Sequence, residues 1–350
     1  MFPSASKSLQ GRWNSKRRWT FGGEPWEQCE SISPGGVGYM GSRGARLIAL
    51  AISWALIGIW AMTSAMTAGT PADELPAGIA LFYFVAAMFH ACAAVGAKRA
   101  AKLVSAALLI ALFAEVLSVH SGFPFGAHQH AAAMGPKFAG APVRLILDWF
   151  GIAWPAWLIS RLAIGTDQGD SAIWSQVATA LLTALIVTGA DSAGVAIAST
   201  IRGYWAYDHP GGFFGVPLTD LGGSILTGFA IGLALSFLAQ PKRLPPRSAG
   251  LFWALAPAFW ILYAAQYALY PLAGRPLAAP PTVELADRVW RVHDIYEAAA
   301  VIAVLTMLPV ALLALARLGQ RTDRRAGDAA GRSRRGREAH VLEDPAPTEA

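Results

Sequence analysis

The sequence predicts an all-α polytopic integral membrane protein, a helical bundle of about eight transmembrane helices with both termini in the cytoplasm. Hydrophobic residues make up 55% of the 350 residues and charged residues only 14%, a balance that is rare in water-soluble proteins. Long apolar windows recur along the chain, and basic residues gather beside alternate ends of these windows. Composition, window length and charge distribution therefore point to the same fold class.

Eight windows of about 20 apolar residues are long enough to cross the hydrocarbon core of a bilayer as helices. In chain order they are 45–68, 76–97, 101–119, 143–164, 172–199, 221–239, 250–272 and 293–316. An even number of crossings returns the chain to the side on which it began. In the sixth window Gly228 and Gly232 form a GxxxG pair, a spacing typical of closely packed membrane helices.

The distribution of Lys and Arg residues sets the orientation of these helices. If both termini are cytoplasmic, 22 of the 28 Lys and Arg residues lie on the cytoplasmic side and six on the other. Cytoplasmic loops of membrane proteins carry such an excess. The net charge of +6 is therefore a topology signal, and we expect a multi-pass protein of the cell membrane that contacts lipid and does not bind nucleic acid.

Polar tails flank the predicted transmembrane domain at 43–316. Residues 1–42 mix Gly, Ser, Arg and Trp without periodicity, so we expect a disordered N-terminal tail. The sequence leaves Met1 and Met40 open as the natural start. Residues 317–350 are rich in Arg, Ala and Gly with few large apolar side chains, which is the composition of a disordered cytoplasmic tail.

Carboxylates within the apolar windows are the first candidates for function, because ionisable groups are costly inside a membrane. Counting depth at about 1.5 Å per residue places all of them in the outer third of the bilayer on this topology. We therefore expect a site that opens at the outer face. The carboxylates concerned are Glu115, Asp148, Asp191, Asp294 and Glu297.

One chemistry for this region is a metal site. His120, His128 and His130 follow Glu115 closely, and imidazole and carboxylate groups bind zinc and iron. The seven histidines of the chain are too few for the many-histidine clusters of membrane di-iron oxygenases, and an HxH pair in a loop is more often incidental. We therefore expect no metal and no other cofactor.

The other chemistry is acid catalysis on an apolar substrate. A carboxyl group surrounded by hydrocarbon keeps its proton more readily than in water and can act as a general acid. Protonation of a trisubstituted alkene gives a tertiary carbocation, which aromatic faces stabilise, and a second carboxylate can orient the water that captures it. Aromatic residues near the predicted outer face could form the walls of such a site: Phe123, Phe125, Trp149, Trp205 and Phe214.

Several motifs in this part of the chain resemble those of one family. They are GAKRA (96–100), Glu115 at the end of an apolar helix, SGFPFG (121–126), MGP (134–136), ADSAGVA (190–196), GYW (203–205) and GGFFGVPLTD (211–220). Over about residues 76–240 the chain resembles the integral-membrane carotenoid biosynthesis family that includes the γ-carotene and bisanhydrobacterioruberin hydratases. Each motif alone is weak, and together they are fairly specific.

The resemblance implies a multi-span enzyme that adds water to a terminal C=C bond of an acyclic or ψ-end carotenoid without a redox cofactor. It implies that Glu115 and Asp191 are the acid and the water-orienting group, and that Phe123, Phe125, Trp205 and Phe214 are substrate-slot walls. A carotenoid or polyprenoid is then the substrate, and other carotenoid biosynthesis enzymes are possible partners.

The chain departs from the family pattern at several positions. His128 and His130 stand where the pattern has paired tyrosines, and Val195 stands where it has a second Asp. Asp220, Asp208 or a loop histidine could replace the missing carboxylate. We take Asp220 as the third candidate catalytic residue, and His128 and Trp149 as further substrate-binding candidates.

Two other functions fit the same residues. A carotenoid isomerase would use the same protonated intermediate. A non-catalytic polyprenoid or carotenoid carrier or transporter would use the same aromatic slot, and would be expected to have helices interrupted by Gly or Pro near the membrane midplane.

Overall fold

The computed structural model describes residues 38–66, 79–166, 172–239, 244–245, 249–272, 281–285 and 287–342, with side chains outside 38–43, 79–80 and 321–342. Residues 43–350 form one compact unit, to which the following description is confined. Most of the expected N-terminal tail, residues 1–37, lies outside the described residues.

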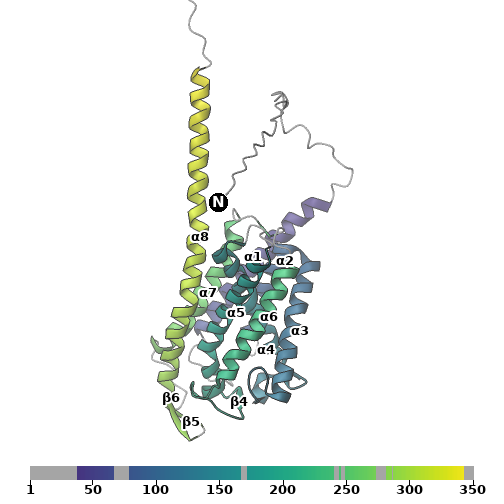
Figure 1. Ribbon diagram of the computed structural model, residues 1–350, viewed down its shortest axis with the longest axis vertical. Helices are drawn as coiled ribbons and strands as arrows, with labels where there is room; N and C mark the ends of the chain where they lie inside the picture. Colours follow the sequence, from purple (N-terminus) through teal and green to yellow (C-terminus); the bar gives the residue numbers. More distant parts are fainter. Residues whose placement is uncertain are drawn as a thin grey trace, which may run out of the picture. The chain divides into compact units, whose positions relative to one another are not determined.

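The described residues form eight α-helices, which confirms the all-α membrane fold class (Figure 1). Seven are long and apolar enough to cross a membrane, and α2 is a shorter apolar helix. The helices are α1 (Gly38–Met66), α2 (Ile79–Val95), α3 (Ala97–Ser121), α4 (Val143–Ile164), α5 (Ile173–Ala196), α6 (Leu218–Leu238), α7 (Gly250–Leu272) and α8 (Val292–Leu342).

Most helices differ from their predicted limits by a few residues, and the differences at the α2–α3 junction and at the end of α8 have clear physical reasons. Helix α2 ends at Val95, and α3 begins at Ala97 after a single linking residue, Gly96, whose φ of 83° favours glycine. Helix α8 continues to Leu342, well past the predicted end at residue 316. The added segment is rich in Ala and Arg, which are strong helix formers, so its polar composition does not end the helix.

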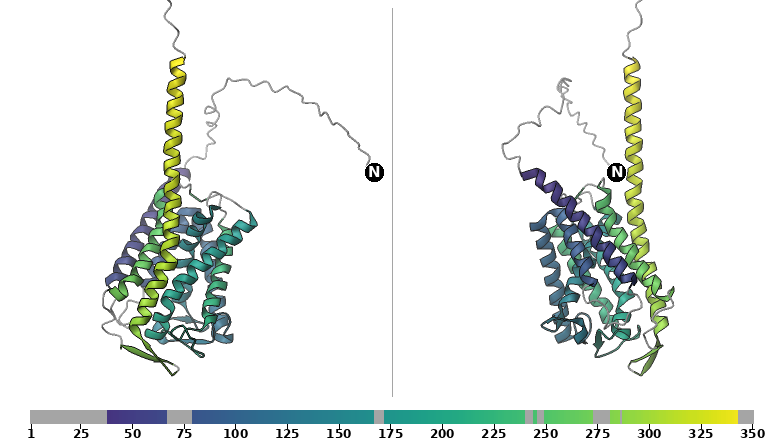
Figure 2. Two further views of the ribbon diagram at one scale, coloured as in Figure 1. Left: turned by 60° about the vertical axis from the view of Figure 1, so that its left-hand side comes forward. Right: turned by 180° about the vertical axis from the view of Figure 1, so that it is seen from behind.

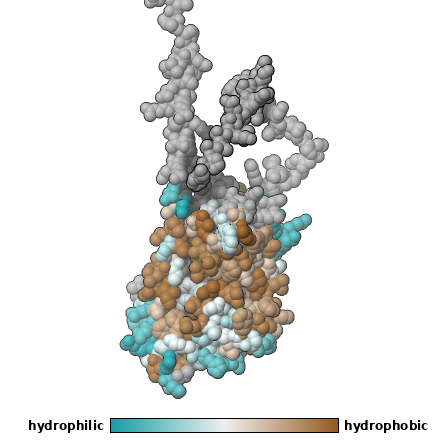
Figure 3. Space-filling view, viewed as in Figure 1, coloured by the Kyte–Doolittle hydropathy of each residue, from teal (hydrophilic) through white to brown (hydrophobic). Residues whose placement is uncertain are grey.

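The lateral surface of the bundle is apolar. Large hydrophobic side chains such as Leu109, Phe113 and Leu305 are exposed on it. Figure 3 shows apolar residues covering the side of the bundle, while polar residues gather at the end where the strands lie. This distribution suits helices surrounded by lipid, because burial in hydrocarbon removes apolar surface from water.

Helix α4 carries much of the core. Phe150, Trp154 and Trp157 are fully buried on it, and α4 packs against α2, α5 and α7. His90 on α2 accepts a 3.0 Å hydrogen bond from Trp154 Nε1 at Nδ1, and its Nε2 donates to the carbonyl of Phe252 at 3.0 Å. Since both ring nitrogens are satisfied, His90 ties three helices together.

Helices α5 and α6 pack closely through the predicted GxxxG pair. A Cβ atom added at Gly228 would lie 3.1 Å from Cα of Ala184, and one added at Gly232 would lie 2.9 Å from Cα of Ala180. Both distances are too short for ordinary contact. The prediction that these glycines pack helices is confirmed.

Short strands and turns gather at one end of the bundle, opposite the end at which α8 leaves it (Figures 1 and 2). All three strand pairs are antiparallel: β1 with β4, β2 with β3, and β5 with β6. Their bounds are β1 (His128–His130), β2 (Lys137–Phe138), β3 (Ala141–Pro142), β4 (Trp205–Tyr207), β5 (Thr282–Leu285) and β6 (Arg288–Arg291). A 3₁₀ turn (Ala132–Met134) and a π-helical turn (Ile197–Ile201) complete the described elements.

Candidate active site

A cavity of about 250 Å³ lies within the bundle and is lined by residues of α1 to α7 and of strands β1 and β4. Its polar lining includes the carboxylates of Glu115, Asp148, Asp191 and Asp220. Ligand pockets for drug-sized molecules are typically ~300–1,000 Å³. The cavity is therefore large enough for one end of a long apolar molecule and too small for a whole one.

Near its end α3 carries Glu115, one of the polar residues that line the cavity, and then runs into the SGFPFG turn. Gly122, with φ 76°, caps α3 and donates its N–H to Ser118 O at 2.8 Å. The hydroxyl of Ser118 accepts from Phe125 N at 3.1 Å and donates to Gly126 O at 3.0 Å. The turn thereby folds back onto α3, one helical turn after Glu115.

The pairing of β1 with β4 aims both loop histidines in one direction. In this ladder His128 is opposite Tyr207 and His130 is opposite Trp205. Alternate residues of a strand face the same side, so His128 and His130 share a face, and Gln129 between them is exposed. The spacing HxH places both histidines on one face because this segment forms a short strand.

Glu115, His128 and His130 form a buried cluster. Their side chains are 5%, 4% and 1% exposed respectively. The two imidazole Nε2 atoms are 3.1 Å apart, and Oε2 of Glu115 lies 3.9 Å from Nε2 of His128 and 3.6 Å from Nε2 of His130. His120, the third loop histidine, is exposed on the end of α3 and takes no part.

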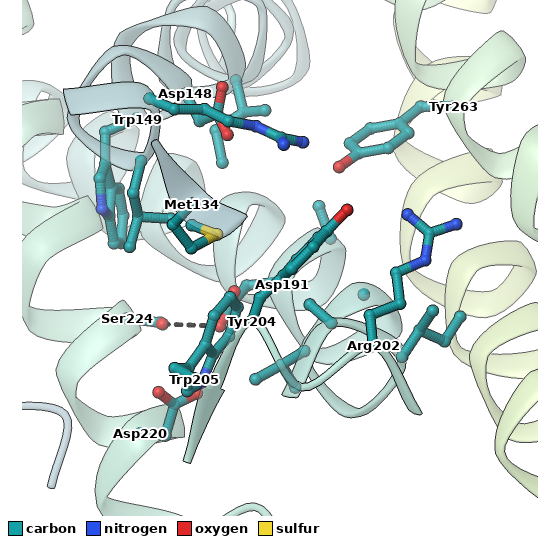
Figure 4. A pocket seen from close by; sticks show the side chains of 18 of the residues that line it. Met134, Asp148, Trp149, Asp191, Arg202, Tyr204, Trp205, Asp220, Ser224 and Tyr263 are labelled. Carbon is teal, nitrogen blue, oxygen red and sulfur yellow. Dashed lines mark hydrogen bonds between the residues drawn. The ribbon is translucent and has the colours of Figure 1, made fainter. Parts of the chain in front are cut away.

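Two further carboxylates reach the cavity from α5 and α6. Asp191 Oδ2 accepts a 2.8 Å hydrogen bond from the hydroxyl of Ser224, and Asp220 Oδ1 accepts one of 2.8 Å from the hydroxyl of Tyr207. Figure 4 shows Asp191 near the centre of the pocket with Ser224 beside it and Asp220 beyond. Asp191, Asp220 and Glu115 interact electrostatically with one another.

Two side chains of the site that lie on strands, His128 on β1 and Tyr207 on β4, have shifted pKa values. Burial lowers the pKa of His128, against the opposing effects of the Gly126 hydrogen bond and the Glu115 charge, so the imidazole is neutral at pH 7. Burial and then the Asp220 carboxylate raise the pKa of Tyr207 well above its usual value. Tyr207 therefore stays a neutral hydrogen-bond donor toward Asp220.

Aromatic side chains form much of the remaining wall. Phe125 lies against Trp149 with ring centroids 6.0 Å apart, and Trp205 lies 6.1 Å from the ring of His130. These three predicted residues line the cavity together with the predicted His128. Met134 of the MGP motif also lines it.

Helix α7 supplies a tyrosine stripe that sequence reasoning missed. Tyr263, Tyr267 and Tyr270 all line the cavity, and neighbouring rings in this series lie 5.4 and 6.2 Å apart. Gly194 on α5 leaves room for this stripe, because a Cβ atom there would lie 2.5 Å from the Tyr267 hydroxyl oxygen. The signal was present in the sequence, since spacings of four and three residues place side chains on one helix face.

Two arginines, Arg144 and Arg202, line the cavity and interact with neighbouring carboxylate and tyrosine groups. Arg144 interacts electrostatically with Asp148, and its guanidinium lies 5.6 Å from the ring centroid of Tyr204. Arg202 interacts with the hydroxyl groups of Tyr204 and Tyr270. Figure 4 shows Arg202 approaching the pocket from the side opposite Ser224.

Several predicted residues lie away from the cavity. Phe123 is 57% exposed at the tip of the SGFPFG turn, and Phe214 packs against Trp290 with ring centroids 5.3 Å apart. Neither is among the residues that line the cavity. Both rings were expected to form walls of the substrate slot, which is wrong for this cavity. The ring of Phe123 points outward from its turn, and the ring of Phe214 points toward Trp290 on β6.

Of the five carboxylates predicted in the apolar windows, Asp294 and Glu297 do not line the cavity, whereas the other three do. Asp294 pairs with Arg291 at 3.0 Å and Glu297 with His293 at 3.0 Å, and all four side chains are substantially exposed. Of the three groups considered as replacements for the carboxylate missing at Val195, Asp220 and His128 line the cavity, whereas Asp208 is exposed.

The profile of the family described as "Carotenoid biosynthesis protein" matches residues 77–279, more than half of the chain. A bisanhydrobacterioruberin hydratase of Haloarcula japonica is 29% identical over 143 residues, which are 40% of this chain and 46% of that protein. The aligned region thus spans less than half the length of this relative. No solved structure matches.

Proposed function

Because the chain belongs to the carotenoid biosynthesis protein family, we propose that it is a hydratase, which adds water to a terminal C=C bond of an acyclic or ψ-end carotenoid. The observation that carries the proposal is a buried cavity with three interacting carboxylates, Glu115, Asp191 and Asp220, beside aromatic walls. The partial similarity to a bisanhydrobacterioruberin hydratase supports the same reaction type.

The cavity suits the charge changes of alkene hydration. A carboxyl group in an apolar cavity keeps its proton more readily than in water. A carboxyl group that keeps its proton can transfer it to the less substituted carbon of the alkene. The rings of Trp149, Trp205 and Phe125 then face a tertiary carbocation, which aromatic faces attract.

We assign the acid role to Asp191 and the water-orienting role to Asp220. Asp191 lies near the centre of the pocket, where its carboxyl can reach an inserted chain end, and Ser224 fixes one of its oxygens. Tyr207 fixes Asp220 in the same way from β4. Water adds to the tertiary carbon, its second proton passes to Asp220, and proton exchange among the carboxylates restores the acid.

Glu115, His128 and His130 supply a further part of the polar wall of the cavity. In this proposal they help to hold the water molecule, while His128 and the aromatic residues Phe125, Trp149 and Trp205 contact the substrate. A cavity of about 250 Å³ takes one end of a polyene, and the rest of the chain remains outside it. The proposed location of the protein is the cell membrane, where such substrates dissolve.

The reaction is tested by expression in a bacterium that makes lycopene or γ-carotene, followed by mass spectrometry of the extracted pigment. The expected product is heavier than the substrate by one water. Pigment of unchanged mass across several acyclic and ψ-end carotenoids, with the protein present in the membrane, contradicts the proposal. A product of unchanged mass but new retention time identifies isomerisation instead.

A further inference from the structure

Three ligand-type atoms converge at Glu115, His128 and His130. Nε2 of each imidazole and Oε2 of the carboxylate all lie within 4.8 Å of one another. Around zinc at ligand distances of ~2.0–2.2 Å, tetrahedral ligand atoms lie about 3.3–3.5 Å apart. The observed separations of 3.1, 3.6 and 3.9 Å bracket that value.

The hydrogen bonds around His128 fix which of its nitrogens is available. Its Nδ1 lies 2.8 Å from the carbonyl oxygen of Gly126, which can only accept, so Nδ1 carries the proton. Nε2 of the neutral ring then presents a lone pair toward His130 and Glu115. A backbone carbonyl that holds the distal N–H is the usual support of a metal-ligating histidine.

Two of these three residues, Glu115 and His130, have unsatisfied polar atoms. Oε2 of Glu115 and Nδ1 of His130 are buried and accept or donate no hydrogen bond within the described residues. A buried carboxylate oxygen without a partner is costly, and Oε2 faces two imidazoles at distances too long for hydrogen bonds. A cation between the three side chains would satisfy this oxygen and would replace the 3.1 Å hydrogen bond between the two Nε2 atoms.

The local charge also favours a cation. Asp191 and Asp220 interact electrostatically with Glu115, so a divalent ion at the cluster would offset the repulsion among these carboxylates. Two imidazoles and one carboxylate form the donor set of many zinc sites, in which three protein ligands leave a further position open. All three residues line the cavity, so the open position would face it.

From this geometry we propose that Glu115, His128 and His130 form a binding site for a divalent transition-metal ion, with zinc as the best-matched ion. From the sequence we expected no metal, because an HxH pair in a loop is more often incidental. The pairing of β1 with β4 changes that assessment by bringing both Nε2 atoms to the carboxylate. The site does not depend on the proposed hydration, since binding can be measured without any carotenoid.

The test uses the full-length chain, purified in detergent with a tag that contains no histidine. The protein is stripped with EDTA, exposed to Zn²⁺, desalted and analysed by inductively coupled plasma mass spectrometry. We expect one zinc per chain, and Co²⁺ in its place should give the intense visible absorption of a site with fewer than six ligands. Zn²⁺ should also raise the melting temperature of the stripped protein.

Three single variants, Glu115→Gln, His128→Gln and His130→Gln, should each weaken zinc binding at least tenfold. His293→Gln is the matched control, because His293 is an exposed histidine beside the carboxylate of Glu297 and does not line the cavity. Gel filtration and circular dichroism verify folding, and if one variant aggregates, the other two decide. Wild-type protein without stoichiometric zinc, or folded variants that bind it as tightly as wild type, would overturn the proposal.

Discussion

The hydroxyl of Ser224 on α6 donates a 2.8 Å hydrogen bond to Oδ2 of Asp191 on α5. The bond joins the two helices that pack through Gly228 and Gly232, so close packing and the orientation of a cavity carboxylate depend on the same interface. One helix pair therefore supplies Asp191, its hydrogen-bond donor and Asp220.

Asp191→Asn should lower hydration by at least about 100-fold, because an amide cannot act as a general acid and such catalysis contributes ~10²–10⁴-fold. Pigment conversion per amount of membrane-inserted protein is the measurement. The control is Asp294→Asn, which removes an exposed carboxylate paired with Arg291 and outside the cavity. Full conversion by the Asp191 variant would remove this residue from the mechanism.

Ser224→Ala should lower hydration less, by about fivefold to tenfold, because it removes one hydrogen bond of ~1 kcal/mol net and keeps the carboxyl group. The double variant with Asp191→Asn should be no slower than Asp191→Asn alone. Additive losses in the double variant would show that Ser224 acts independently of Asp191.

Tyr207→Phe should reduce hydration about tenfold or more and lower stability by about 1–3 kcal/mol, because it leaves Oδ1 of buried Asp220 without its donor. Conversion and thermal unfolding in detergent measure the two effects. Asp208→Asn, an exposed change at the next residue, should alter neither. Equal behaviour of the two variants would argue against a role of Tyr207 in positioning Asp220.

Gly232→Ala should destabilise the protein by about 1–3 kcal/mol, because the new Cβ would lie 2.9 Å from Cα of Ala180. Gly222→Ala on the same helix is the matched control. A Cβ atom there meets nothing within 4 Å, so this variant should be neutral or stabilising by up to ~1 kcal/mol. Thermal unfolding of both in one detergent gives the comparison, and a smaller loss at 232 than at 222 would contradict the α5–α6 packing.

His90→Leu should destabilise the bundle by about 1–3 kcal/mol, because it leaves Nε1 of buried Trp154 without its acceptor and removes the hydrogen bond to the Phe252 carbonyl. Since His90 does not line the cavity, whatever variant remains folded should bind zinc as the wild type does. Thermal unfolding and metal analysis on the same preparation separate these effects. Loss of zinc from folded His90→Leu would place this histidine in the metal site.

Much of the site could be predicted because membrane constraints act locally. Glu115 and Asp191 stand out in apolar windows, and counting helices brought them to one end of the bundle before any tertiary information. The same reasoning selected Asp294 and Glu297, which are exposed on α8. Depth along a helix follows from sequence position, but the face that meets a cavity depends on how neighbouring helices pack.

For loop residues, too, the sequence did not predict which side chains line the cavity. Phe123 and Phe125 are two residues apart in one turn, yet only Phe125 lines the cavity, because Ser118 pulls the backbone of Phe125 onto α3 while Phe123 remains at the exposed tip. In the sequence Asp220 was the preferred replacement for the missing carboxylate, and Asp208 stayed an alternative. Only the start of α6 brings Asp220 inward to Tyr207.

The sequence by itself determined an all-α membrane protein, its apolar helices, close helix packing at Gly228 and Gly232, and which helices carry carboxylates, because hydropathy and helical spacing depend on nearby residues. Only the tertiary structure decided that β1 pairs with β4, and hence that His128 and His130 meet Glu115 rather than solvent. That pairing joins segments about 75 residues apart, and no local pattern encodes so distant a register.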